Sequence, residues 1–272
     1  MDSVRASHSP RSRADETAAP LGAGFWRWTG VFGLAVVAIT WAEFPLWVIG
    51  GSPPAYNGAA AADELFRHST IAFTRILMDL GIYVAVMTFA ARLSHLIRLA
   101  RPGFDWAATL VFGSAAVWIG VTLVADGLEG GATLDTLGGS ADPSAVRALI
   151  EGTLLTFNGS IAFVLTGLFL AAAGYATFAT DVLRRWTAWL AYIAAALCAI
   201  SVPAMYAGPL NYTGFYNAGG WGPAIIANFP PLIWFLVVGI VMLRKRDAKA
   251  SERVVENRMM ARTSSSEKAS SR

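Results

Sequence analysis

Apolar residues along this chain come in blocks of about twenty, and short polar segments separate the blocks. A helix needs about 20 apolar residues to cross the hydrocarbon core of a bilayer. The pattern therefore predicts an all-α fold, a polytopic transmembrane bundle of six helices. The predicted spans are residues 31–50, 70–91, 106–126, 153–176, 186–206 and 223–243.

Both ends of the sequence are polar. Residues 1–29 carry little apolar surface, and the residues after 244 are rich in serine and charge. Segments of this composition cannot bury enough apolar surface to fold. We predict a disordered cytoplasmic leader at 1–29, a six-span transmembrane domain at 30–244, and a disordered basic cytoplasmic tail at 245–272.

The basic residues predict an orientation. Of the 21 lysines and arginines, 18 fall on one side of the predicted spans and two, Arg67 and Arg147, on the other; Arg75 lies within the second span. Cytoplasmic loops carry such an excess, so we expect both termini to be cytoplasmic. Arginine outnumbers lysine, and alanine and glycine are abundant, which suggests a GC-rich bacterial genome. The expected location is the plasma membrane of a bacterium.

Composition excludes several classes of protein. Only 14% of the 272 residues are charged, against about 25% in soluble domains, so membrane lipids are the expected surroundings. The single cysteine, Cys198, allows no disulfide framework, and the three histidines are far apart, so we predict no metal site and no cofactor. The net charge of +3 comes from residues beside the spans, so nucleic-acid binding is not expected. The oligomeric state is not predicted.

Three ionisable residues stand out within the predicted spans: Glu43 in the first, and Arg75 and Asp79 in the second. Intramembrane charges usually face a bundle interior or a water-filled cavity. At 1.5 Å per residue all three fall about 8–14 Å below the outer ends of their spans. Arg75 and Asp79 are four residues apart and share a helix face, so they are expected to pair.

Other polar residues fall at a similar depth. Asn158 and Asn228 lie in the outer parts of the fourth and sixth spans. The predicted ligand-binding set is therefore Glu43, Arg75, Asp79, Asn158 and Asn228. The outer loop between the third and fourth spans, residues 127–152, is rich in glycine and acidic residues. Within it, residues 142–151 predict a short helix with Asp142 as N-cap and Pro143 at its first position.

A stretch of the second half has a familiar pattern. It comprises Asn158-Gly159-Ser160, the run from Leu165 to Leu170, Gly174-Tyr175 and Leu183-Arg184-Arg185-Trp186. This resembles bacterial multi-span membrane proteins of domain-of-unknown-function family 4386, which often have Leu-Pro-Arg-Trp where this chain has Arg184 in place of the proline. The resemblance covers residues 150–200 and implies the multi-span architecture. It implies no activity.

Three functional hypotheses follow. The first is a protein that binds or moves a small amphipathic or lipid-like molecule in an outward-facing pocket, where Arg75 would meet an anionic head group or the acids a cationic one. The second is an enzyme acting on a lipid or isoprenoid, with Glu43 or Asp79 as general acid. The third is a non-catalytic accessory or regulatory subunit, in which the charged residues only hold helices together.

Overall fold

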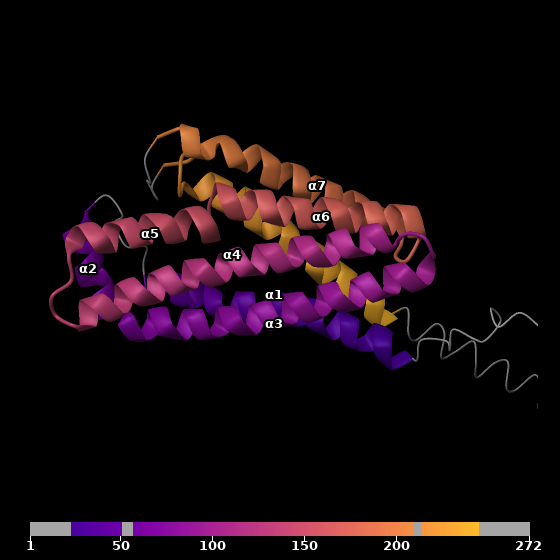
Figure 1. The fold of residues 1–272 in the computed structure, drawn as a ribbon, viewed down its shortest axis with the longest axis horizontal. Helices are drawn as coiled ribbons and strands as arrows, with labels where there is room; N and C mark the ends of the chain where they lie inside the picture. The colour runs from indigo at the N-terminus through magenta and orange to yellow at the C-terminus, as the bar shows by residue number, and fades with distance from the viewer. Residues whose placement is uncertain (1–22, 51–56, 209–213, 245–272) are drawn as a thin grey trace, which may run out of the picture.

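The computed structural model describes residues 23–50, 57–208 and 214–244. Across these ranges it is 88% helical and has no strand. Six helical segments are long and apolar enough to cross a membrane, which confirms the predicted six-span all-α bundle. The two ends of the described chain lie at the same end of the bundle (Figure 1). We call this the terminal end.

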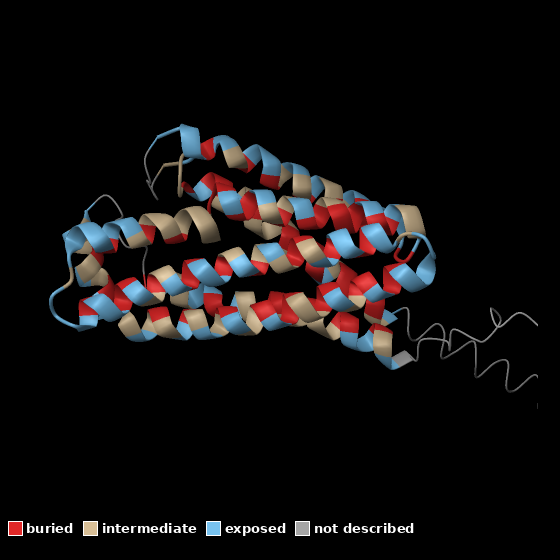
Figure 2. Cartoon of the chain, viewed as in Figure 1, coloured by how far each residue is buried: buried red, intermediate tan, exposed pale blue. Residues whose placement is uncertain are grey.

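The described part of the chain runs through seven α-helices, a short 3-10 helix and a final helical span. They are α1 (Ala23–Gly50), α2 (Gly58–Arg67), α3 (Ser69–Ala100), α4 (Asp105–Leu137), α5 (Pro143–Phe157), α6 (Ser160–Thr180), α7 (Arg185–Ser201) and η2 (Val202–Tyr206). The last helix, Trp221–Arg244, we call the C-terminal span. Exposed residues lie mainly on the outer faces of the helices, and buried residues lie where the helices face one another (Figure 2).

Several boundaries differ from the prediction. α1 begins at Ala23, so residues 23–29, expected in the disordered leader, are helical. The remainder of the predicted leader and the whole predicted tail lie outside the described residues. α3 and α4 contain 32 and 33 residues, which gives each a length of about 50 Å. The hydrocarbon core is about 30 Å thick, so both helices extend past it or tilt within it.

The prediction of a loop at 127–152 is wrong, because most of these residues are helical. α4 continues through its glycines to Leu137, and α5 follows after five residues. With α2, these segments form a helical cap at the end of the bundle opposite the terminal end (Figure 1). The cap has its own small hydrophobic core, which consists of Ala61, Leu65, Ala132, Val146 and Ile150.

The predicted start of the short helix is confirmed. The Asp142 side chain accepts a hydrogen bond from the Ser144 backbone N–H at 2.8 Å, and Pro143 occupies the first turn of α5. An aspartate at this position satisfies one of the backbone donors that every helix N-terminus leaves free. α5 then runs on to Phe157, beyond the predicted end at residue 151.

The spans form a closed ring. α1 packs on α3, α3 on α4, α4 on α6 and α6 on α7. The C-terminal span closes the ring, since the Trp234 indole N–H donates to the Thr187 carbonyl of α7 at 3.1 Å and Gly239 packs on Gly30 of α1. Trp234 also joins Phe89, Phe169 and Phe235 in a central aromatic cluster with ring centroids 5.2–5.9 Å apart.

The predicted fourth span is broken. Helical geometry stops at Asn158 and Gly159 and resumes at Ser160. A Cβ on Gly159 would lie 2.5 Å from the Leu154 carbonyl oxygen, so only glycine fits this turn. A break of this kind within a membrane is tolerated where it lines a cavity or is covered by protein.

We predict that Gly30→Ala destabilises the bundle by about 1–3 kcal/mol. A Cβ at Gly30 would lie 2.7 Å from the Gly239 carbonyl oxygen, so α1 and the C-terminal span would have to separate. Gly113→Ala is the matched control, because a Cβ at Gly113 has no neighbour within 4 Å. Thermal unfolding in detergent measures both variants. A Gly30→Ala protein that melts at or above the wild-type temperature would contradict the close packing.

Candidate functional site

A group of buried ionisable residues lies between α1, α3 and α4. Its members are Glu43, Arg75, Asp79, Asp126 and Glu129, which we call the charged cluster, and none is more than 8% exposed. The cluster contains four carboxyl groups and one guanidinium group. Taking charges out of water costs several kcal/mol each unless partners replace the water, so the contacts within the cluster decide what it can do.

Arg75 is held on three sides. Its Nη1 and Nη2 atoms lie 3.3 and 3.4 Å from the two carboxylate oxygens of Glu129, in a two-point contact. Its Nε lies 3.7 Å from Glu43 Oε1. The guanidinium carbon sits 3.3 Å from the centre of the Trp47 ring, and the Trp47 indole N–H donates to Glu43 Oε1 at 2.7 Å. Arg75 is therefore enclosed by Glu43, Glu129 and Trp47.

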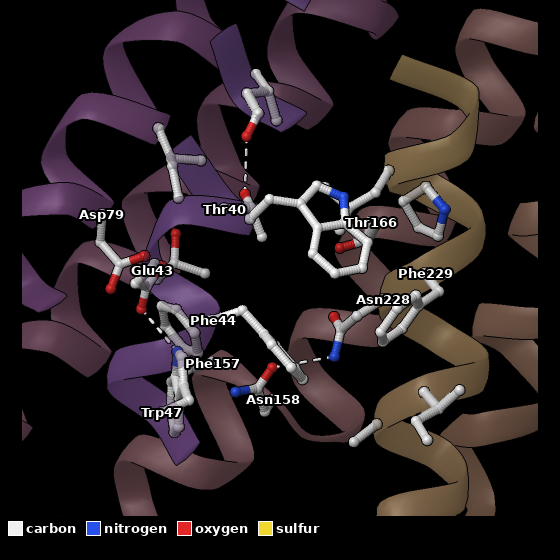
Figure 3. Close-up of a pocket in the computed structure, with 18 of the residues that line it drawn as sticks. Thr40, Glu43, Phe44, Trp47, Asp79, Phe157, Asn158, Thr166, Asn228 and Phe229 are labelled. Atoms are coloured by element: carbon white, nitrogen blue, oxygen red, sulfur yellow. Dashed lines mark hydrogen bonds between the residues drawn. The ribbon is translucent and has the colours of Figure 1, made fainter. Parts of the chain in front are cut away.

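The other two carboxyl groups have different surroundings. The side chain of Asp79 lies against that of Glu43 (Figure 3). Asp126 accepts a hydrogen bond from the Tyr83 hydroxyl at 2.7 Å. Across the described residues the structure contains no ion pair between Arg75 and Asp79, so the predicted pairing of these two residues is wrong.

A cavity of about 410 Å³ adjoins the cluster, between α1 and the C-terminal span. α3, α4, the α5–α6 break and α6 complete its wall. Most of the lining is apolar, and aromatic rings are frequent: Trp41, Phe44, Trp47, Tyr83, Trp118, Phe157, Trp221, Phe229 and Phe235. Ligand pockets of this type bury most of a small molecule in apolar contact and orient it with a few polar groups. We call this cavity the pocket.

Polar groups lie on two walls of the pocket (Figure 3). Glu43 and Asp79 form one wall. On the other, the Asn228 side-chain amide donates to Asn158 Oδ1 at 3.1 Å. This bond ties the α5–α6 break to the C-terminal span. The pocket therefore has a carboxyl wall and an amide wall, with aromatic rings between them.

The mouth of the pocket faces sideways. Four lining residues are themselves exposed: Trp41 and Phe44 on α1, and Trp221 and Ile225 on the C-terminal span. The Trp41 and Phe229 rings meet across the gap in an edge-to-face contact at 5.9 Å. Because both helices are membrane spans, this mouth opens between helices toward the surrounding lipid.

The structure brings most of the predicted ligand-binding residues together. Glu43, Asp79, Asn158 and Asn228 all line the pocket. Arg75 does not, so its predicted place in the pocket wall is wrong. Its side chain turns toward Glu129 instead, because a two-point contact with a buried carboxylate is the strongest pairing that the fold offers to a guanidinium.

The predicted site did not include Asp126 and Glu129, which the structure buries in the charged cluster. One signal was present. Thr122, Asp126, Glu129 and Thr133 are spaced four, three and four residues apart, which puts them on one helix face, and all four are buried. The pair Gly130–Gly131 directly after Glu129 suggested a loop and hid this pattern.

The chemistry of the site is that of an acid-rich polar wall. The structure shows no group of three or more His, Cys, Asp or Glu residues with metal-binding geometry within the ranges it describes. No family model, curated protein or solved structure matches the chain. The resemblance to family 4386 therefore stays a prediction. The carboxyl wall, with Arg75 turned away from the pocket, favours a positively charged occupant over a negative one.

We predict that Arg75→Gln destabilises the protein by about 3–5 kcal/mol, because Glu43 and Glu129 would lose the cation that both contact. The control is Arg185→Gln, which removes an exposed pair with Asp181 at 2.9 Å and should cost at most about 1 kcal/mol. The stability of both variants is measured by the yield of folded protein and by the unfolding temperature in detergent. Equal stability of the two variants would show that the charged cluster does not hold α1, α3 and α4 together.

Proposed function

We propose that this protein binds a small amphipathic cation in the pocket, as the recognition step of a membrane binding or transport protein. The observation that carries the proposal is the composition of the pocket wall: two buried carboxyl groups, many aromatic rings and, among the described lining residues, no cationic side chain. Aromatic faces attract cations, most strongly where water is excluded. A carboxyl wall adds charge complementarity.

The size and mouth of the pocket support the same class of ligand. A cavity of about 410 Å³ falls within the range of small-molecule sites, about 300–1,000 Å³. A ligand reaching it from the lipid needs an apolar body, which the aromatic lining would cover. Its charged group would lie at Glu43 and Asp79, and a polar substituent could bond the Asn158–Asn228 pair.

The cap faces the outside of the cell in this proposal. Basic residues support that orientation because they gather at the terminal end of the described chain, and cytoplasmic segments carry such an excess. At the terminal end these are Arg27, Arg92, Arg98, Arg101, Arg184, Arg185 and Arg244, against Arg67 and Arg147 in the cap. The pocket then lies in the outer half of a bacterial plasma membrane.

The enzyme hypothesis has one observation in its favour. A carboxyl pair inside an aromatic pocket could protonate a polyene and stabilise the cation that forms. Arg75 is turned away from the pocket, so nothing in the described wall would hold a diphosphate, and the substrate would be a lipid without one. Conversion of an isoprenoid such as squalene by the purified protein would favour this hypothesis over binding alone.

We predict that the full-length protein in lipid nanodiscs binds tetraphenylphosphonium saturably and does not bind tetraphenylborate, an anion of similar size and shape. Glu43→Gln and Asp79→Asn should each weaken binding by about tenfold or more, because each removes a charge from the buried wall. Equilibrium dialysis measures the affinities, with empty nanodiscs to subtract partition into lipid.

The matched control is Glu151→Gln, an exposed carboxyl of the cap that pairs with Arg147 at 2.9 Å and lies outside the pocket. It should bind like wild type. Equal uptake of the cation and the anion, or unchanged affinity in folded Glu43→Gln and Asp79→Asn, would refute the proposal. Loss of folding in both carboxyl variants with no binding by wild type would favour the purely structural role.

A further inference from the structure

We propose that the pocket exchanges a proton for its cation: the Glu43–Asp79 pair holds a proton in the empty site and releases it when a cationic ligand binds. This inference rests on the proposed function and adds that cation binding is coupled to proton release. Such exchange is the chemical step of a carrier in which a proton and a cationic substrate compete for one site. It also predicts how binding responds to pH.

The first support is the imbalance of charge in the cluster. Four carboxyl groups are buried there with one guanidinium group, that of Arg75. Arg75 already pairs with Glu129 and Glu43. A buried carboxylate without a cation does not persist in a low-dielectric interior; it takes up a proton or a cation. The empty pocket therefore requires protons in the cluster.

The second support is the contact between Glu43 and Asp79. Their side chains lie side by side (Figure 3), and both line the pocket. Two adjacent buried carboxyl groups share one proton, because two negative charges side by side cannot both persist. The Glu43–Asp79 pair, which has to carry a proton, is therefore also the part of the cluster that a ligand would contact.

A second cavity adjoins the charged cluster. It is much smaller, about 10 Å³, and lies beneath the cap, lined by Glu64, His68, Arg75 and Glu129 among others. It shares no lining residue with the pocket. Because Arg75 contacts both Glu129 and Glu43, this residue lies between the two cavities.

The small cavity is lined by polar and apolar residues and can hold about one water molecule. Arg75 Nε, a buried nitrogen of its lining, makes no hydrogen bond among the described residues and lies 3.7 Å from Glu43 Oε1. His68 Nδ1 lies 3.1 Å from Glu64 Oε1, and both side chains are partly exposed on the cap. A water in this cavity would contact Arg75 and Glu129, but a guanidinium keeps its protons. The proton shared by Glu43 and Asp79 therefore leaves through the pocket.

The ionisable groups around the pair and the small cavity come from four helices. They are Glu43 from α1; Glu64 and His68 from α2; Arg75, Asp79 and Tyr83 from α3; and Asp126 and Glu129 from α4. α5, α6 and the C-terminal span contribute polar or apolar groups that do not titrate, such as Thr166 and Asn228. Tyr83 donates to Asp126, which leaves the Glu43–Asp79 pair as the exchanging site.

The exchange balances without any other reactant. In the empty site one proton is shared by two carboxyl groups. The ligand brings one positive charge, the O–H bond of the shared proton breaks, and the proton passes to water in the pocket. The occupied site then has two carboxylates, the ligand cation and Arg75, so its total charge is unchanged.

The test is titration calorimetry of full-length protein in nanodiscs with tetraphenylphosphonium, a cation that carries no proton of its own. Titrations in phosphate and in Tris buffer differ in apparent heat by the number of protons released multiplied by the difference in buffer ionisation enthalpy. We expect the protein to release about one proton for each ligand bound. In the pH range where the pair is protonated in the empty site, the dissociation constant should fall about tenfold for each unit by which the pH rises.

Two variants locate the exchange. Asp79→Asn should bind more weakly and release no proton, because a single carboxyl has no pair with which to share one. Glu151→Gln, the exposed control, should match wild type in both affinity and proton number. Proton release of about one in folded Asp79→Asn would overturn the assignment to this pair.

The outcomes for wild-type protein separate the two claims. Saturable binding with no proton release in either buffer overturns the exchange and leaves cation binding intact. The absence of saturable binding overturns the proposed function and the exchange with it. Both results come from wild-type protein, so they do not depend on whether a carboxyl variant folds. Release of about one proton, lost in Asp79→Asn, supports the exchange.

Discussion

The structure depends on one buried guanidinium. Arg75 contacts Glu129 through two nitrogens, Glu43 through a third, and the face of Trp47 through its planar group. These contacts join α1, α3 and α4 at one level. Removing a partner from a buried pair costs far more than removing one at the surface. Arg75 is thus a structural cation. Because it pairs within the cluster, the charged residues in the described pocket wall are the acids Glu43 and Asp79.

The rest of the site follows from how the helices meet beside this cluster. α1 and the C-terminal span touch at Gly30 and Gly239, and the pocket lies between the same two helices, toward the cap. At the break between α5 and α6, the Asn158 side-chain amide joins the wall and accepts a hydrogen bond from Asn228. The cavity is therefore bounded by the close contact between α1 and the C-terminal span and by the break between α5 and α6.

Much of the fold was predictable because a bilayer imposes length and polarity on every span. Six apolar blocks predicted six spans, and the Asp142-Pro143 pair predicted a helix start that the structure confirms. The extension of α4 to Leu137 was not predictable from local pattern, since its glycines and acids are typical of a loop. Packing of Ala132 and its neighbours in the cap outweighs that weak local preference.

The site was predictable in part for similar reasons. Glu43 and Asp79 could be placed at one level from helix rise alone, because their spans are adjacent in sequence. The partner of Arg75 could not, because Glu129 is 54 residues away and only the fold brings it near. The aromatic lining draws on helices that are far apart in the chain, so no sequence window contains it.

The central claim is that a cation belongs beside Glu43 and Asp79. The most direct measurement is an experimental structure of the full-length protein with tetraphenylarsonium, in which arsenic is located by its anomalous scattering. The account predicts one arsenic site inside the pocket, between the carboxyl wall and the aromatic rings. Arsenic found only on the lipid-facing surface, or a Glu43 side chain turned into lipid away from Arg75 and Asp79, would contradict it.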